Sequence, residues 1–105
     1  MKDYSSKSTL EGNLIQIENL YKSIFTEVGN TSIELSNKLV SVWHEDSTNI
    51  DAASLEIIEQ DEGYIISYWD GYSLAEQIDE KEIKSALKVF KRLARKLAKN
   101  LQRFS

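Results

Sequence analysis

Apolar residues recur at helical spacing in two stretches, one near each end of the chain. In the first stretch they follow steps of three and four, the spacing of one face of an α-helix: Leu10, Leu14, Ile17, Tyr21, Ile24 and Val28. Ser8 and Glu11 have the spacing of a capping box, and Gly29-Asn30 tolerates the backbone conformation that ends many helices. The pattern therefore predicts a helix over residues 9–28.

The second stretch has the same period and is longer. Its apolar positions are Ile83, Leu87, Phe90, Ala94, Leu97, Leu101 and Phe104. Basic side chains occupy the opposite sector of the same helical wheel. Acidic residues at 79, 80 and 82 suit the positive N-terminal end of a helix. We predict a helix over residues 79–103, about 37 Å long at 1.5 Å per residue.

Runs of β-branched and aromatic residues predict strands between these helices. Three runs are bounded by polar segments, at 38–44, 54–59 and 64–69. Asp70-Gly71 between aromatic residues is typical of a two-residue hairpin loop and predicts a fourth strand at 72–78. Two assignments stay open: a helix beginning at Ser73 competes with the fourth strand, and residues 31–38 fit either a strand or a short helix.

This order of elements predicts a single α+β domain over residues 1–105. The fold class is a two-layer sandwich with an N-terminal helix, a three- to four-stranded antiparallel meander and a long C-terminal helix. Both helices are expected to cover one face of the sheet. Residues 1–8 are polar and expected to be flexible.

The charges are separated along the chain. The first eighty residues carry a net charge of −12 and the last twenty-five +8, which together give the formal −4. Between residues 39 and 80 there are eleven carboxylates and no Lys or Arg. Long stretches of one sign bear on the choice of binding partners, so the sequence predicts an acidic sheet and a basic C-terminal helix.

The chain has no motif of a catalytic, cofactor or metal site. It has no Cys, and His44 is its single histidine, which we interpret as a surface residue at a strand end. Adjacent carboxylates such as Asp61-Glu62 and Asp79-Glu80 fit solvated turns and helix starts better than an acid–base pair, which needs a pocket. No phosphate-binding loop or nucleophile motif is present. We therefore expect no enzyme, no cofactor and no metal.

The strand at 64–69 places large apolar side chains on both faces of the sheet. Alternation directs Tyr64, Ile66 and Tyr68 to one face, and Ile65, Ser67 and Trp69 to the other. Two helices on one side leave the second set to be covered by a partner protein or by a second copy of the chain. A homodimer is therefore one expectation.

The main hypothesis is a non-enzymatic, acidic binding protein that docks on and occludes a cationic protein surface. Such a surface is typical of proteins that handle nucleic acid, so the target is expected among them. Aromatic residues supply hot spots and carboxylates supply charge. The partner-binding residues predicted are Trp43, Glu56, Glu59, Trp69, Asp70 and Tyr72.

The alternative hypothesis uses the basic face of the C-terminal helix to contact nucleic acid. Its cations could neutralise phosphates, with steep salt dependence. The residues predicted for this role are Lys84, Lys88, Lys91, Arg92, Arg95 and Lys99. We favour it less, because no aromatic or amide cluster accompanies the cations and the acidic part of the chain repels phosphate. The same face also fits an acidic protein partner or a solvated helix surface.

The sequence has no apolar run long enough to span a membrane and no signal-peptide pattern in residues 1–8. Together with the absence of Cys, this leads us to expect a cytoplasmic protein.

Overall fold

A computed structural model describes residues 9–45, 53–71 and 73–103. The expectation for residues 1–8 lies outside this range. The helical elements are a 3₁₀ turn η1 (Glu11–Asn13), α2 (Leu14–Ile24) and α3 (Ile83–Arg103). The strands are β1 (Thr31–Leu35), β2 (Leu39–His44), β3 (Ser54–Gln60), β4 (Gly63–Trp69) and β5 (Leu74–Glu80).

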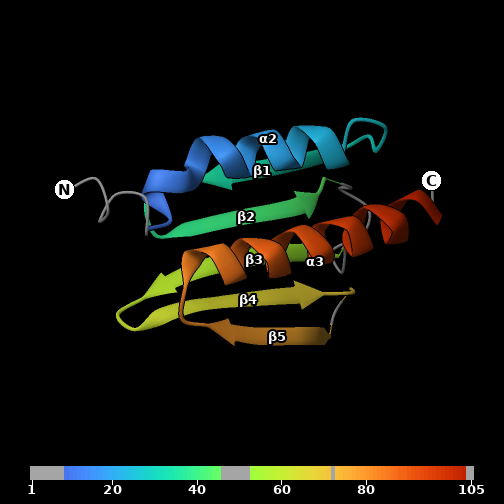
Figure 1. Cartoon of the computed structure of the whole chain (residues 1–105). Helices are drawn as coiled ribbons and strands as arrows, with labels where there is room; N and C mark the ends of the chain where they lie inside the picture. The colour runs from blue at the N-terminus through green and yellow to red at the C-terminus, as the bar shows by residue number, and fades with distance from the viewer. Residues whose placement is uncertain (1–8, 46–52, 72, 104–105) are drawn as a thin grey trace.

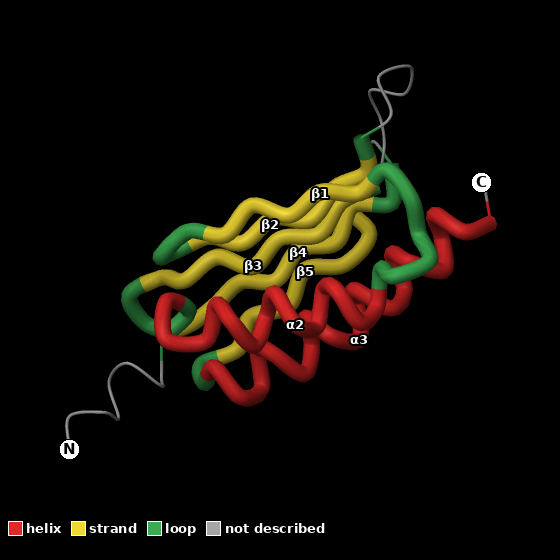
Figure 2. The backbone as a smooth tube through the Cα atoms, turned by 90° about the horizontal axis from the view of Figure 1, so that it is seen from above, coloured by secondary structure: helices red, strands yellow, loops and turns green. Residues whose placement is uncertain are grey.

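The fold is α+β, and its five strands form one antiparallel sheet in the order β1-β2-β3-β4-β5. Each strand pairs with its neighbour in the sequence, so the sheet is a meander. Both helices lie on the same face of the sheet and run in the same direction along it (Figures 1 and 2). Within the described residues no segment crosses the opposite face, which we call the open face.

The sheet has one strand more than the three to four expected. The extra strand is β1, in the segment that the sequence left open between strand and helix. Its pairing with β2 decides the outcome, because it places Ile33 opposite Val42 and Leu35 opposite Val40 on the helix-covered face. Asn30 adopts a positive φ of 60°, which turns the chain from the helix side into the strand.

The first helix is shorter than the predicted 9–28. It begins as the 3₁₀ turn, where the Thr9 hydroxyl accepts the Gly12 N–H at 3.1 Å, and the α-helix ends at Ile24. The Thr26 hydroxyl donates back to the Lys22 carbonyl just past this end. Phe25 and Val28 are nevertheless buried, because a turn carries them into the core. The apolar period therefore continues beyond the helix.

The predicted boundary between the fourth strand and the last helix is also wrong. β5 occupies 74–80 rather than 72–78, and α3 begins at Ile83 rather than at 79. Pairing of Asp79 with Ile65 and of Glu80 with Tyr64 extends the strand through residues assigned to the helix. A helix beginning at Ser73 is excluded by the same pairing.

The loop between β4 and β5 is longer than the predicted two residues. Trp69 pairs with Leu74, so four residues separate the strands, and the Asp70 N–H donates to the Ser73 carbonyl at 3.2 Å. The register shifts beside Trp69 because Ala75 is an extra residue between the pairs made by Leu74 and Glu76. Consequently Leu74 and Glu76 point to opposite faces although they are two residues apart.

The core fills the space between the helices and the covered face. Fully buried side chains come from α3, such as Phe90 and Leu97, and from the central strands, such as Ile57 and Ile66. Among the apolar positions of the two predicted helical stripes that the structure describes, those buried are Leu10, Ile17, Val28, Leu87, Phe90, Ala94 and Leu97. The others are half-buried at the edge of the core: Leu14, Tyr21, Ile24, Ile83 and Leu101.

Candidate protein-binding face of the sheet

Two tryptophans from neighbouring parts of the sheet lie in one row across the open face. The register pairs Trp43 with Ser54 and Ser54 with Trp69, so a single small side chain separates them. Leu74 continues the row on β5 and is 42% exposed. With strands about 4.8 Å apart, the two tryptophan backbones lie about 10 Å from each other. Both indoles are half-buried although no helix covers them.

A second apolar row crosses the same face four residues further along the strands. It consists of Leu39, Ile58 and Ile65 and ends at Asp79 on β5. All three apolar side chains are half-buried. A monomeric protein rarely exposes contiguous apolar area unless it is used for binding, so two such rows mark this face as a candidate interface.

A polar row lies between the two apolar rows. Its members, in order from β1 to β5, are Glu34, Ser41, Glu56, Ser67 and Gln77. The Gln77 side-chain amide donates to the Ser67 hydroxyl at 3.1 Å, which satisfies the one buried polar side chain of the sheet. The remaining polar groups of this row are the Ser41 hydroxyl and the carboxylates of Glu34 and Glu56.

The open face has a single sign of charge. Glu34, Glu56 and Asp79 project from it, and the described strands place no Lys, Arg or His on this side. His44 pairs with Thr31 and belongs to the helix-covered side. Carboxylates beside aromatic and aliphatic rows give a surface that is complementary to a cationic, partly apolar partner.

Three of the predicted partner-binding residues come together on this face: Trp43, Glu56 and Trp69. Asp70 lies in the loop beyond Trp69, where its carboxylate accepts the Ser73 hydroxyl at 3.1 Å. Glu59 lies on the other side of the sheet. It accepts the Leu10 N–H at 2.8 Å and lies 3.8 Å from the Lys38 ammonium, so it anchors the start of the helical layer. Tyr72 lies outside the described residues.

Several residues of this face were not among those predicted to bind a partner. Ile65 was placed on the face by alternation, while Leu39 and Ile58 were assigned to strands without a role. The position of Leu74 on the face depends on the bulge in β5. Alternation within 38–44 and 54–59 already groups Leu39 with Trp43 and Glu56 with Ile58. Glu34 was not predicted to lie on this face, because the sequence left residues 31–38 open between a strand and a short helix.

The cations predicted for nucleic-acid contact all lie exposed on α3, in two groups. Arg92 faces β5, where its guanidinium lies 3.1 Å from Glu76 Oε1, and Lys96 lies 2.7 Å from Glu76 Oε2. These hydrogen bonds, from Lys96 first and then Arg92, lower the pKa of the Glu76 carboxyl. The second group forms no ion pair within the described residues: Lys84, Lys88, Lys91, Arg95 and Lys99.

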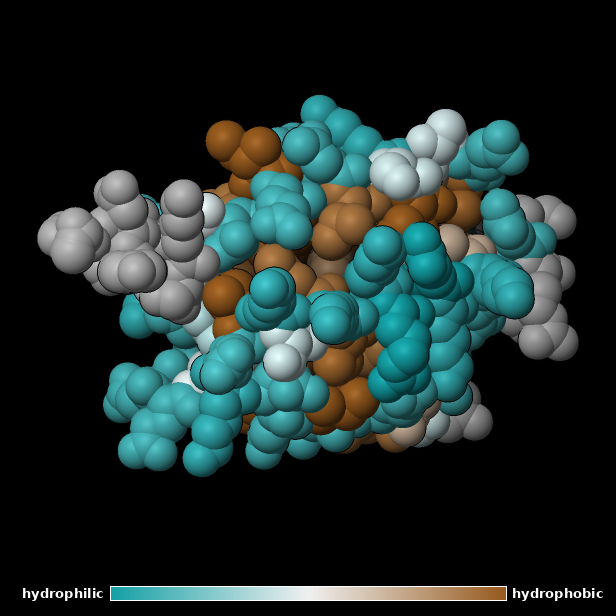
Figure 3. Space-filling model, in the orientation of Figure 1, coloured by the Kyte–Doolittle hydropathy of each residue, from teal (hydrophilic) through white to brown (hydrophobic). Residues whose placement is uncertain are grey.

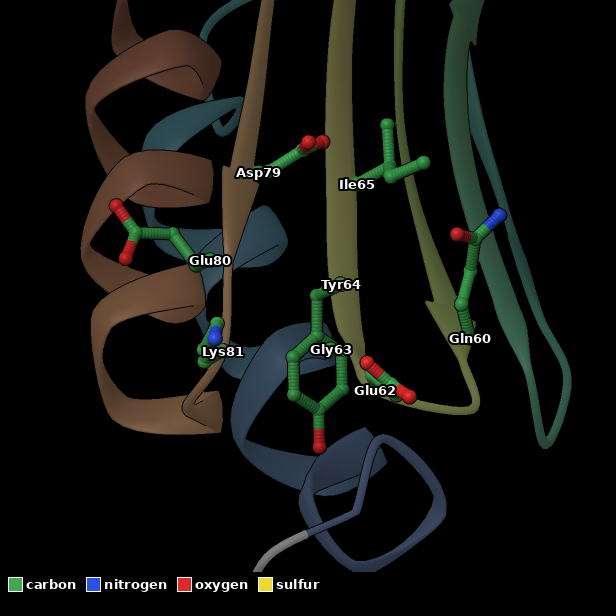
Figure 4. A pocket seen from close by; sticks show the side chains of 8 residues that line it. All are labelled: Gln60, Glu62, Gly63, Tyr64, Ile65, Asp79, Glu80 and Lys81. Atoms are coloured by element: carbon green, nitrogen blue, oxygen red, sulfur yellow. The ribbon is translucent and has the colours of Figure 1, made fainter.

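A hollow of about 300 Å³ lies where the β3–β4 turn meets the end of β5. Its acidic side chains do not converge, because Asp79 and Glu80 point to opposite sides of β5 (Figure 4). Burial, followed by the charge of Glu59, raises the pKa of the Tyr64 hydroxyl on its wall. Within the described ranges no group of three or more His, Cys, Asp or Glu could hold a metal ion.

Comparisons with protein-family models, with curated proteins and with solved structures find no match for this chain. In the part of the chain that the structure describes, no helix is long and apolar enough to cross a membrane.

Proposed function

We propose that the protein is a non-enzymatic binding protein whose open sheet face docks on and occludes a cationic protein surface. The observation that supports this most is the row of Trp43 and Trp69 flanked by carboxylates, on a face that no described segment covers. Tryptophan is enriched among interface residues that contribute most to affinity. The proposed target is a protein that handles nucleic acid, because such proteins carry the complementary charge.

The two kinds of group on the face have different effects on binding. The carboxylates Glu34, Glu56 and Asp79 steer a cationic partner and make its association rate fall with rising salt. Once bound, the partner covers the tryptophan row, and removal of that apolar area from water slows dissociation. The expected complex therefore forms quickly at low salt and dissociates slowly.

A second copy of the chain is a poorer partner for this face. Two open faces packed against each other bring the carboxylates of Glu34, Glu56 and Asp79 toward the same groups of the other copy. Like charges across an interface oppose association. Sedimentation of the protein at physiological salt is therefore expected to give a monomer, and a salt-independent dimer would favour pairing of the open faces instead.

The proposal is tested by capture from the native host with three immobilised proteins. These are the wild type, a Trp43→Ala/Trp69→Ala variant, and a control with Lys88→Glu/Lys91→Glu on the opposite layer. We expect the wild type and the control to retain the same basic protein and the tryptophan variant to lose it. Retention by the tryptophan variant, or recovery of no basic protein by any of the three, would contradict the proposal.

A nucleic-acid role for the α3 cations remains the alternative function. A gel-shift at about 150 mM salt with duplex and single-stranded probes discriminates, because phosphate neutralisation by the unpaired cations gives binding that declines steeply with salt. If such binding is found and Lys88→Glu/Lys91→Glu abolishes it, the basic side of α3 and not the open sheet face would be the functional surface.

A further inference from the structure

The helical layer carries a groove that the proposed function does not use. It lies between α2 and α3 and has a volume of about 660 Å³. A second groove of about 270 Å³ follows further along the same two helices, lined by Ser23 and Ile24 from α2 and by Arg95 and Lys99 from α3. Figure 3 shows this side of the molecule, with hydrophobic side chains exposed between the two helices and hydrophilic ones along α3.

The larger groove has an apolar floor and one cationic wall. Leu20 of α2 faces Ile83 and Leu87 of α3 across the floor. The α3 wall carries Lys84, Lys88 and Lys91, while the opposite wall is polar and uncharged, with Asn13 of η1 and Gln16 of α2. The groove therefore combines exposed apolar area with positive charge on one side only.

The cations of this wall are not neutralised by the rest of the described fold. Lys84, Lys88, Lys91, Arg95 and Lys99 follow one another at steps of four, three, four and four, and none has a carboxylate within ion-pair distance among the described residues. Arg92 and Lys96, on the flank toward β5, both bind Glu76. These five cations thus leave a run of unpaired positive charge along the two grooves, over about 22 Å of helix.

We propose that this groove binds an acidic amphipathic helix of a partner protein. An amphipathic helix places its apolar stripe in a groove between two helices and its charged flanks on the rims. Here the stripe covers Leu20, Ile83 and Leu87, and acidic side chains at helical spacing meet Lys84, Lys88 and Lys91. The site is separate from the open sheet face, so one molecule can engage a cationic and an acidic protein on its two layers.

Nucleic acid fits the groove less well than such a helix. Single strands bind by stacking bases on aromatic side chains, and among the described residues that line the two grooves none is aromatic. A phosphate backbone held by the lysines also leaves the apolar floor uncovered. An anionic membrane meets the exposed lysines but does not reach the floor below them.

The test uses two synthetic peptides of about fifteen residues, which span about 22 Å as a helix. The first has leucines along one helical face and glutamates on both flanks, and the second has the same composition with the leucines scrambled. Binding of each labelled peptide is measured by fluorescence anisotropy at physiological salt. Duplex DNA, single-stranded RNA and anionic phosphatidylserine vesicles serve as competing probes.

Two double variants with the same change of net charge provide the comparison. Lys88→Glu/Lys91→Glu reverses the groove wall, and Lys22→Glu/Lys81→Glu reverses two exposed lysines that do not line the groove. We expect the amphipathic peptide to bind about tenfold or more tightly than the scrambled one, with the groove variant losing at least about tenfold and the control less than about twofold.

Several results would overturn the proposal. These are equal binding of the two peptides, equal loss in the two variants, tighter groove-dependent binding of a nucleic acid or of vesicles, or no peptide binding at about 100 μM. Trp43→Ala/Trp69→Ala is expected to keep its peptide affinity. Peptide binding therefore tests the groove alone, and capture of a basic protein tests the open sheet face alone. Either proposal can fail without the other.

Discussion

Trp43 and Trp69 lie in one cross-strand row on the open face of the sheet, with Ser54 alone between them. They are the only two tryptophans of the chain. Their emission therefore reports on this face and on no other part of the molecule. Both indoles are half-buried although no described helix covers this face.

The first prediction concerns the charge around these indoles. Quenching of tryptophan emission by caesium and by iodide is each expressed relative to its quenching of free N-acetyltryptophanamide. Because Glu34, Glu56 and Asp79 share their face and no described cation does, the relative quenching should be greater for caesium than for iodide at low salt. The Glu34→Gln/Glu56→Gln variant should reduce the difference. Neutral acrylamide, which does not sense charge, serves as the control for access. A greater relative quenching by iodide would show that the face is not acidic.

A second prediction concerns the turn between β3 and β4. Gly63 has φ of 153°, and a Cβ there would lie 2.6 Å from the Glu80 carbonyl oxygen. Gly63→Ala should lower the free energy of unfolding by about 1–3 kcal/mol, because both the backbone and the neighbouring strand must shift. Denaturant unfolding measures the change.

Gly29→Ala is the matched control for this substitution. A Cβ at Gly29 meets nothing within 4 Å, so its unfolding free energy should change by less than about 0.5 kcal/mol. Equal effects at the two glycines would argue against the close approach of β5 to the β3–β4 turn.

A third prediction tests how α3 packs on the sheet. Phe90 is fully buried, so Phe90→Ala should lower the free energy of unfolding by about 3–5 kcal/mol through lost burial and a residual cavity. Lys88→Ala on the exposed side of the same helix should leave it nearly unchanged. If Phe90→Ala had the same melting temperature as the wild type, α3 would not be packed on the sheet through Phe90.

A fourth prediction concerns the ion-pair cluster between α3 and β5. Lys96 and Arg92 lower the pKa of Glu76 in the folded protein below its ordinary value of 4.5. The stabilisation is therefore present at neutral pH and is lost as the pH falls through the lowered pKa. Glu76→Gln should cost less than about 1 kcal/mol at pH 7, because the Arg92 and Lys96 side chains are 53% and 52% exposed.

The pH dependence separates this ion-pair effect from a packing effect. The stability difference between wild type and Glu76→Gln should shrink as the pH falls through the lowered pKa of Glu76, and thermal melts at several pH values measure it. Glu56→Gln on the open face makes no described ion pair to lose and provides the control. A difference at Glu76 that stays constant down to low pH would contradict the ion-pair explanation.

Local patterns predicted the α+β class, the two helices, the central strands and the apolar face of α3. They were wrong where one residue pattern fits two kinds of local structure. Phe25 and Val28 keep the helical period but lie in a turn, and the acidic pair Asp79-Glu80 suits a helix start as well as the edge strand it forms. Pairing with β4 makes Asp79-Glu80 part of a strand, and strand pairing cannot be read from a single sequence.

The candidate site was partly predictable for the same reason. Alternation along β4 placed Trp69 and Ile65 together, away from Tyr64. It also separates Glu56 from Glu59, because residues three apart in a strand point to opposite faces, yet the sequence analysis grouped them by charge. The groove between α2 and α3 depends on how two distant helices lie side by side, which the spacing of neither helix reveals.

The most direct test of the proposed docking surface is a titration of the wild-type protein with the basic protein recovered by capture, followed by tryptophan emission. If the partner contributes no tryptophan signal change of its own, the account predicts that emission shifts to shorter wavelength and that caesium quenching falls as the complex forms, with an association rate that drops as salt is raised. Saturable binding that leaves both the emission maximum and the quenching unchanged would contradict it, because the partner would then be docked elsewhere on the molecule.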